Sequence, residues 1–215
     1  MGRCTILLLK KRKKEVPVCL ARFFLGLRMS FHRIGQTKFS YLCTMEKRLE
    51  TLLKDAKEVE KESRKYFQRL KRRTPKTLDL TMQALHEEEF AKTDCLTCAN
   101  CCKTSSPIFT PKDIQRISKH FRMKEVDFMT QFLERDSDDF YVLQSVPCTF
   151  LDTQDNSCSI YDVRPKACSE YPHTNRKKFI QITELTLKNT EICPAAFAIV
   201  ENLKKTLPLG GKKTL

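Results

Sequence analysis

Four cysteines within eight residues are the most reactive feature of the sequence: Cys95, Cys98, Cys101 and Cys102. Two cysteines separated by two residues can turn both sulfurs onto one cation, so this spacing recurs in zinc ribbons and iron–sulfur loops. Neighbouring Cys101 and Cys102 point in different directions in most backbone conformations, which suits separate sites or separate edges of one polynuclear cluster. The spacing predicts metal ligation by this group, with redox disulfides as the alternative.

Four further cysteines follow at long, nearly regular intervals: Cys148, Cys158, Cys168 and Cys193. Eight ligands suit two four-sulfur sites, or one site with additional labile thiols. Sulfur-only coordination suits both Zn²⁺ and iron–sulfur clusters, so the predicted cofactor is zinc or an iron–sulfur cluster. Cys193-Pro194 echoes the end of a bacterial ferredoxin run, but Ser105 stands where a ferredoxin would have cysteine, which disfavours a simple ferredoxin fold.

Other side chains near the cysteines have predicted roles that follow from charge. Thiolate sites are negative and need nearby donors and cations, so we expect Arg164 to anchor the site and residues 176–178 to face solvent. His173 is expected to be an exposed polar residue near a turn, with completion of a metal site or proton transfer as the alternative. Tyr161 and Tyr171 are expected to pack, with hydroxyl groups bonded to the backbone.

The composition excludes several classes of protein. Eleven cysteines cannot all pair and no cleavable signal sequence is evident, so we expect a cytoplasmic protein rather than a secreted disulfide framework. Residues 36–209 contain no glycine, which removes the glycine-rich phosphate loops of nucleotide-binding proteins.

The net charge of +14 is concentrated near the start of the chain. Residues 1–44 hold ten basic residues and one acidic residue, and the remainder has an ordinary balance for a globular domain. This basic leader contains no apolar run long enough for a transmembrane segment. We expect it to be disordered or mis-translated upstream sequence with Met45 as the natural start, and a targeting role is the alternative.

Hydrophobic spacing divides the rest of the chain. A long amphipathic helix is predicted from Leu49 to Leu70, ended by Pro75, and a second over about residues 78–92. These form a predicted helical arm, residues 45–92, which braces a metal-binding domain at residues 93–207 and precedes a tail at 208–215. We expect the arm to pack against the metal-binding domain. The alternative is that it binds a partner or forms a coiled coil.

Shorter elements are predicted within the metal-binding domain. Thr110, Pro111 and Asp113 indicate the start of a helix to about Phe121, and another is expected over residues 124–133 with Val126 and Phe128 on its buried side. Residues 140–143 and 148–151 resemble short strands, residues 153–156 a turn with Asn156 at positive φ, and a last helix begins near Pro194. The predicted fold class is an α-rich α+β domain, small and irregular, centred on cysteine-bound metal, with short β segments and an N-terminal helical pair.

The combination of motifs resembles one known family. The cysteine row at 95–102, followed by Cys148-Thr149-Phe150-Leu151, Cys158-Ser159-Ile160-Tyr161, Arg164-Pro165-Lys166-Ala167-Cys168, Tyr171-Pro172 and Cys193-Pro194, is similar to the YkgJ-type CxxCxxCC family over roughly residues 90–200. That family is described as a putative zinc- or iron-chelating domain. The resemblance implies that the eight cysteines of the body are the metal ligands, and it supplies no reaction.

Three functional classes follow from these patterns. The first is a metal-binding protein with a role in metal or redox handling or in interaction with an unidentified protein partner. The second is an iron–sulfur oxidoreductase, or an enzyme like the flagellin lysine N-methylases, which resemble this cysteine pattern. The third, a nucleic-acid binder, is disfavoured because residues 71–73 and 176–178 have no aromatic stacking motif beside them.

Overall fold

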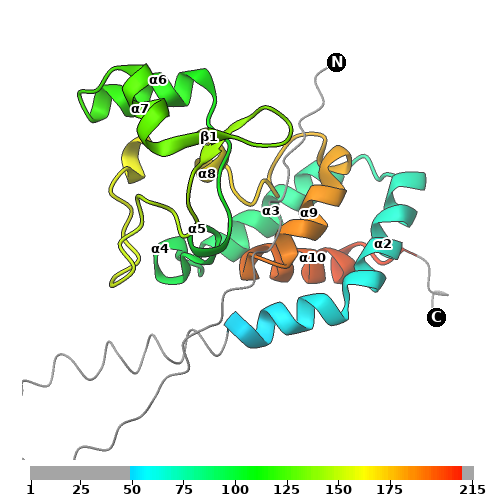
Figure 1. The fold of residues 1–215 in the computed structure, drawn as a ribbon. Coiled ribbons are helices and arrows are strands. Elements are labelled where there is room, and N and C mark those ends of the chain that lie inside the picture. Colours follow the sequence, from blue (N-terminus) through cyan, green and yellow to red (C-terminus); the bar gives the residue numbers. More distant parts are fainter. Residues whose placement is uncertain (1–48, 210–215) are drawn as a thin grey trace, which may run out of the picture.

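The computed structural model describes residues 49–209, and the predicted leader and most of the predicted tail lie outside this range. Residues 49–58 are helical and lead into the main elements (Figure 1). The helices are α2 (Glu60–Arg72), α3 (Leu78–Phe90), α4 (Cys95–Cys98), α5 (Asn100–Thr104), α6 (Pro111–His120), α7 (Glu125–Phe132), α8 (Lys166–Ser169), α9 (Thr183–Thr190) and α10 (Pro194–Thr206). Short 3-10 turns η1 (Tyr161–Val163) and η2 (Phe179–Ile182) and strands β1 (Leu133–Arg135) and β2 (Tyr141–Leu143) complete them.

The first predicted helix forms, but with a turn at Val59. Val59 has φ −94° and ψ 1°, which separates residues 49–58 from α2. The N–H of Val59 still donates to Asp55 O, and the N–H of Ser63 donates to Val59 O, so the α-helical hydrogen-bonding pattern continues across the distortion. The chain turns away after α2, two residues before Pro75.

A helical core lies around α2, α3, α9 and α10. Side chains of all four helices contribute to it: Phe67, Leu70, Leu78, Met82, Leu187, Ile199, Val200 and Leu203. The second and last predicted helices are therefore confirmed as α3 and α10, and both helices of the N-terminal pair pack on the C-terminal part of the chain. We call this group the helical cluster.

A second core includes five buried or partly buried phenylalanines and lies around α6, α7 and the strands. Its buried members are Phe109, Ile114, Ile117, Phe128, Leu133, Leu143, Phe150 and Ile160. The predicted start of α6 is confirmed: Thr110 and Asp113 form a reciprocal capping box, with Pro111 at the first helical position. We call this group the phenylalanine cluster.

The β structure is a small antiparallel pair of strands, with Leu133 opposite Leu143 and Arg135 opposite Tyr141. The strand predicted at residues 140–143 is confirmed as β2. The strand predicted at residues 148–151 is wrong, because these residues form a turn in which only Leu151 bridges, to Cys158.

The two clusters occupy opposite sides of the molecule. Figure 1 shows α6 and α7 on one side and α2 and α10 on the other, with α4 and α5 between them. The predicted buried side of α7 is correct at Phe128, which is inaccessible, and wrong at Val126, which is 65% exposed. The mostly helical architecture with a two-stranded sheet confirms the predicted α-rich α+β class.

Candidate metal centre

The first four cysteines lie on two very short helices that meet at Ala99. Asp94 begins α4 by accepting a hydrogen bond from the N–H of Leu96 at 2.9 Å. Ala99 has φ 47°, a left-handed conformation that ends α4 and lets α5 start immediately in a new direction. This bend brings the cysteines of α4 and those of α5 to one region, and Cys101 Sγ lies 4.0 Å from Cys102 Sγ.

The turn that carries Cys148 and Cys158 is joined to these helices. The N–H of Cys148 donates to the carbonyl oxygen of Cys102 at 2.8 Å. At the tip of the turn, Asn156 has φ 63°, as predicted, and its Nδ2 donates to Thr97 O at 3.2 Å. The turn is thus attached to both α4 and α5.

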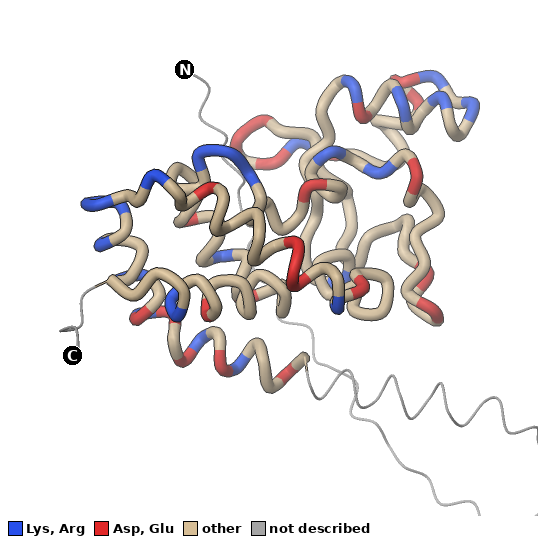
Figure 2. The backbone as a smooth tube through the Cα atoms, turned by 180° about the vertical axis from the view of Figure 1, so that it is seen from behind, with Lys and Arg blue, Asp and Glu red and all other residues tan. Residues whose placement is uncertain are grey.

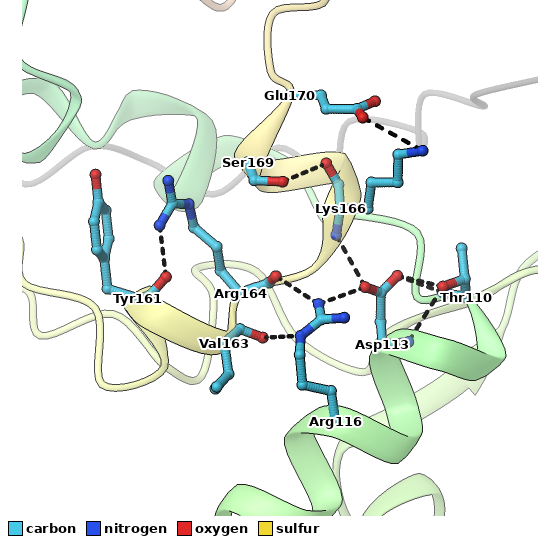
Figure 3. A network of polar contacts seen from close by, with 9 residues as sticks. All are labelled: Thr110, Asp113, Arg116, Tyr161, Val163, Arg164, Lys166, Ser169 and Glu170. Atoms are coloured by element: carbon cyan, nitrogen blue, oxygen red, sulfur yellow. Dashed lines mark hydrogen bonds and ion pairs between the residues drawn. The ribbon is translucent and has the colours of Figure 1, made fainter.

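Cys168 is positioned by a polar network that begins at α6 (Figure 3). The Asp113 carboxylate accepts from the N–H of Lys166 at 3.1 Å, and its Oδ1 lies 2.6 Å from Arg116 Nη2. Arg116 also donates to Val163 O and Arg164 O, at 3.4 and 2.8 Å. These contacts fix the start of α8, which carries Cys168.

Cys193 stands at the N-terminus of α10. Its Sγ accepts a hydrogen bond from the N–H of Ala196 at 3.4 Å, so the sulfur itself caps the helix. Asn100 Nδ2 donates to Ile192 O at 2.7 Å, which ties α5 to the residue before Cys193.

A cavity of about 490 Å³ lies between the two hydrophobic clusters. Its walls include Phe90 and Leu185, which pack on the helical cluster, and Phe109, Phe150 and Ile160 of the phenylalanine cluster. The cysteines that line it are Cys95, Cys101, Cys102, Cys148, Cys158 and Cys168. Cys98 and Cys193 do not line the cavity, but charge on Cys98 raises the pKa of Cys95, and charges on Cys95 and Cys98 raise that of Cys193, after burial in both cases.

The eight thiols are free of disulfides. Within residues 49–209, no three side chains of His, Cys, Asp or Glu already stand in an arrangement that would hold a metal ion. The structure therefore brings the predicted ligand residues into one neighbourhood without closing the sulfurs into coordination geometry.

Burial makes most of these thiols hard to ionise. It raises the pKa of Cys148 to about 11 and that of Cys193 to about 12, and it raises the pKa of Cys168 further. A hydrogen bond from Cys101, together with the charge of nearby Lys103, lowers the pKa of Cys102 to about 7 despite burial. A cation would relieve the cost of placing several thiolates together.

Backbone N–H groups are already directed at four of the sulfurs. Burial raises the pKa of Cys98, Cys148, Cys158 and Cys193, and backbone hydrogen bonds oppose it. The donor is the residue two positions later at the first three cysteines and mainly Ala196, three positions later, at Cys193. A neutral thiol is a weak acceptor, whereas hydrogen bonds to an ionised group are stronger. The recurrent N–H···S contact therefore fits thiolate ligands of a metal.

Tyr171 provides an independent test of whether a metal centre fits. Its hydroxyl is buried and has no hydrogen-bond partner, contrary to the prediction that it would bond to the backbone. Burial raises its pKa well above the ordinary value, and negative charge on Cys193 and Cys101 raises it further. Metal-bound thiolates would supply the acceptor that this buried donor lacks.

The predictions for the other side chains near the cysteines are confirmed only in part. Arg164 lies 3.9 Å from the ring centre of Tyr161 and donates to Tyr161 O, and its charge partly offsets the effect of burial on the Cys158 thiol pKa. Residues 176–178 are exposed, as predicted. His173 is 9% exposed, with φ 66°, so its predicted exposure is wrong; burial lowers its pKa.

Two cavity residues were not predicted. His86 lines the cavity, and its Nδ1 lies 2.8 Å from Thr174 Oγ1. Asn189 also lines it and donates to Pro172 O at 3.0 Å. His86 lies on α3, nine residues before Cys95, and Asn189 lies on α9, four residues before Cys193, but no local pattern marks either residue.

A comparison with known protein families shows which domain the cysteine-rich segment resembles. Residues 94–194 match the family model CxxCxxCC, described as a putative zinc- or iron-chelating domain. This segment is similar to the CxxCxxCC domain. The match confirms the resemblance read from the sequence and supports zinc or iron as the bound metal. No solved structure matches the chain.

The matched segment of the CxxCxxCC domain begins at the N-cap of α4 and ends at the first residue of α10. It thus contains every cysteine described above. Helices α2, α3 and most of α10 lie outside the match. Among the described residues, no helix is long and apolar enough to cross a membrane.

Proposed function

We propose that this protein binds zinc or an iron–sulfur cluster through the eight cysteines of its CxxCxxCC domain and serves in metal or redox handling or in protein interaction. The observation that carries the proposal is the convergence of four chain segments on one cavity. The proposed ligands are Cys95, Cys98, Cys101, Cys102, Cys148, Cys158, Cys168 and Cys193. The N–H groups directed at four sulfurs and the unpartnered Tyr171 hydroxyl support this assignment.

Neighbouring residues would hold these cysteines in position. The Asp113 and Arg116 network fixes the start of α8, and Ala99 fixes the angle between α4 and α5. A bound metal or cluster would cross-link these segments. An iron–sulfur cluster would also supply electron transfer. A cytoplasmic location fits free thiols, because cytosolic reductants keep cysteines reduced.

The charge distribution supports metal binding over nucleic-acid binding. Figure 2 shows basic and acidic residues interspersed along the described chain. The exposed basic groups of α2 are partly paired, since Arg64 and Lys71 both contact Glu184 of α9. A nucleic-acid surface would instead gather unpaired cations on one face.

A redox enzyme is a second candidate, and the cavity is the observation that favours it. Cys95 is the exposed member of the set, and His86 and Asn175 add polar groups to the cavity wall. A small molecule could therefore reach the sulfurs from solvent. Reversible bleaching of visible absorption by a reductant would support this candidate, whereas a colourless zinc protein would reject it.

Metal content of cysteine variants tests the proposal. Full-length protein is purified without oxygen, and zinc and iron are measured by elemental analysis. Cys98→Ser and Cys168→Ser should each lower the metal content and the unfolding temperature together, because metal binding contributes to folding free energy in such domains. Cys43→Ser in the leader is the matched control and should retain wild-type metal. Unchanged metal and melting in both Cys98→Ser and Cys168→Ser would refute these ligands.

A further inference from the structure

Two runs of basic residues that are far apart in the sequence meet at one corner of the helical cluster. The first run ends α2 and continues into the loop before α3, and the second comes just before η2. The exposed cations of the two runs are Arg72, Arg73 and Lys76, and Arg176, Lys177 and Lys178. We call this set the cationic corner.

Asp79 at the start of α3 holds the two runs together. Its carboxylate accepts hydrogen bonds from the N–H groups of Lys178 at 2.7 Å and Phe179 at 3.0 Å. The ring centre of Phe179 lies 6.1 Å from that of Phe67 on α2, and both side chains are buried in the helical cluster. The segment that carries the second run is therefore fixed against both helices that flank the first run.

The cations of this corner lack acidic partners among the described residues. None of the six forms an ion pair within residues 49–209, whereas the neighbouring Lys71 is paired with Glu184. Figure 2 shows basic stretches at the end of the described chain where α2 passes into α3. The corner thus carries a local excess of positive charge, and an external anion could neutralise it.

Leu80 adds an exposed apolar side chain to the same corner. It lies on the first turn of α3 and is 69% exposed, more than any other large apolar side chain among the described residues. The N–H of Leu78 donates to Pro75 O, so a turn leads directly into the helix. Lys76 precedes Leu80 by about one helical turn, which places the two side chains on the same side. Basic groups around an apolar side chain are typical of protein surfaces that bind in a membrane interface.

The shape and composition of the corner favour a lipid surface over a nucleic acid. The loop between α2 and α3 lies at the edge of the helical cluster (Figure 1). Proteins that bind single-stranded nucleic acids combine a cationic groove with aromatic rings, on which the bases stack. The exposed apolar side chain here is a leucine, which can insert among lipid headgroups but offers no ring for stacking.

We propose that the cationic corner docks this protein reversibly on an anionic lipid surface. The six cations would be attracted to acidic headgroups such as that of phosphatidylserine. Leu80 would enter the boundary between the headgroups and the acyl chains. This inference goes beyond the proposed metal binding and does not depend on it.

Vesicle binding of the full-length protein, purified without oxygen, tests the proposal. Residues 10–14, all Lys or Arg, are changed to glutamine in every protein compared, so that the charge run of the leader does not dominate the binding. This protein should cosediment with vesicles of phosphatidylcholine and phosphatidylserine and bind vesicles of phosphatidylcholine alone much more weakly. Added salt should weaken the binding, because it screens the attraction. Equal binding to the two lipid compositions would overturn the proposal.

Charge-removing variants locate the binding surface. Arg73→Gln and Lys177→Gln, one from each run, should each lower the affinity for the mixed vesicles roughly fivefold, and together about 25-fold. Lys119→Gln combined with Lys124→Gln is the matched control, because it removes the same charge from exposed side chains of α6 and the residue before α7. The control should change the affinity little. Equal losses in the control and in the corner variant would show a general charge attraction and overturn the proposal.

Leu80→Ala tests insertion separately from charge. Because this side chain is exposed, the variant should keep the unfolding temperature of the parent protein, while its affinity for the mixed vesicles should fall roughly threefold to tenfold. Val126→Ala is the matched control, since Val126 is exposed on α7, and it should keep the affinity. An unchanged affinity in Leu80→Ala would overturn the assignment of a lipid surface.

A single-stranded RNA oligonucleotide separates a lipid surface from a nucleic acid. At the same salt concentration it should bind more weakly than the mixed vesicles. RNA binding that is tighter than vesicle binding, and is lost in Arg73→Gln combined with Lys177→Gln, would overturn the proposal in favour of a nucleic acid. Zinc and iron contents should be the same in all these variants, so a failure here would leave the proposed metal binding intact.

Discussion

The surroundings of the Tyr171 hydroxyl favour a negatively charged hydrogen-bond acceptor. Its hydroxyl is buried without a partner, next to cysteines that would be thiolates in a metal-bound protein. A buried donor without an acceptor costs about 1–3 kcal/mol, whereas a bond to a charged acceptor contributes about 1.5–3 kcal/mol. A metal-bound thiolate within reach of this hydroxyl would therefore turn an unfavourable burial into a favourable one.

Tyr171→Phe should consequently weaken metal binding. The variant loses a donor that stabilises only the metal-bound form, so metal affinity should fall roughly tenfold to a hundredfold, measured by competition with a chromophoric chelator. Tyr66→Phe is the matched control, because Tyr66 donates to Leu207 O at 2.9 Å in the helical cluster. It should lower the free energy of unfolding and leave metal affinity unchanged. Equal affinities for Tyr171→Phe and wild type would show that the hydroxyl does not face the metal.

The polar network at the start of α6 has a wider structural role than its capping box. Burial raises the pKa of Asp113, but hydrogen bonds from Thr110, Arg116 and the Lys166 N–H outweigh burial and lower it. Arg116 is 41% exposed and the Asp113 side chain 1%, so the carboxylate is the buried partner and depends on all three donors. Through Lys166, this network connects α6 to the helix that carries Cys168.

The lowered pKa of Asp113 gives a pH dependence with a definite sign. The ionised carboxylate stabilises the folded state above its ordinary pKa of 3.8, and this contribution is lost as the pH falls through the lower folded value. Asp113→Asn should lower the free energy of unfolding by about 1–3 kcal/mol at neutral pH. The difference from wild type should shrink below pH 3.8. Urea unfolding at several pH values measures it.

The control for this measurement is Asp138→Asn, since Asp138 is exposed. It should change the free energy of unfolding little at any pH. A constant difference between Asp113→Asn and wild type across the acidic range would contradict the assigned role of the carboxylate.

Local sequence patterns correctly predicted those elements that start or turn at characteristic residues. Thr110, Pro111 and Asp113 define the start of α6 by themselves, and Asn156 adopts the positive φ that its turn requires. Helix α9 was missed because its sequence contains three threonines and no clear apolar stripe. Thr183 and Thr186 are nevertheless fully buried, and the Thr186 hydroxyl bonds to Ile182 O.

The wrong predictions near the site concern residues whose contacts are with residues distant in the sequence. Residues 148–151 have a strand-like composition, but the N–H of Leu151 donates to Cys148 O at 3.1 Å and closes a turn. Strand pairing is thereby reduced to the single bridge between Leu151 and Cys158. His173 is 9% exposed and lines the same cavity as His86 of α3, a residue distant from it in the sequence. The cysteine spacing identified the candidate ligands, yet their arrangement around one cavity depends on tertiary contacts.

The molecule as a whole consists of two apolar clusters with the cysteines between them. The helical cluster contains α2 and α3 as well as α9 and α10, so the segment outside the family match shares a core with the end of the domain. Within residues 49–209, no cysteine belongs to the helical cluster, whereas Cys148 and Cys158 pack against the phenylalanine cluster. Metal binding should therefore affect the two sides unequally.

Removal of metal should loosen the cysteine segments more than the helical cluster. After chelation, hydrogen exchange should accelerate for peptides that span residues 95–102 and 148–168, because the cross-links between them are gone. Peptides around Phe67 and Leu70 should stay protected, since their buried contacts are apolar. Mass spectrometry of exchanged peptides measures both. Equal acceleration throughout the described chain would mean that the two clusters do not fold independently of the metal.

X-ray absorption spectroscopy of the full-length protein, purified without oxygen, tests most directly whether these cysteines hold a metal. We expect absorption at the zinc or iron edge, with a coordination shell of sulfur alone at about 2.3 Å. Iron in a cluster would add a short iron–iron distance. A shell of nitrogen and oxygen, or protein that contains neither metal, would contradict cysteine-bound metal in this domain.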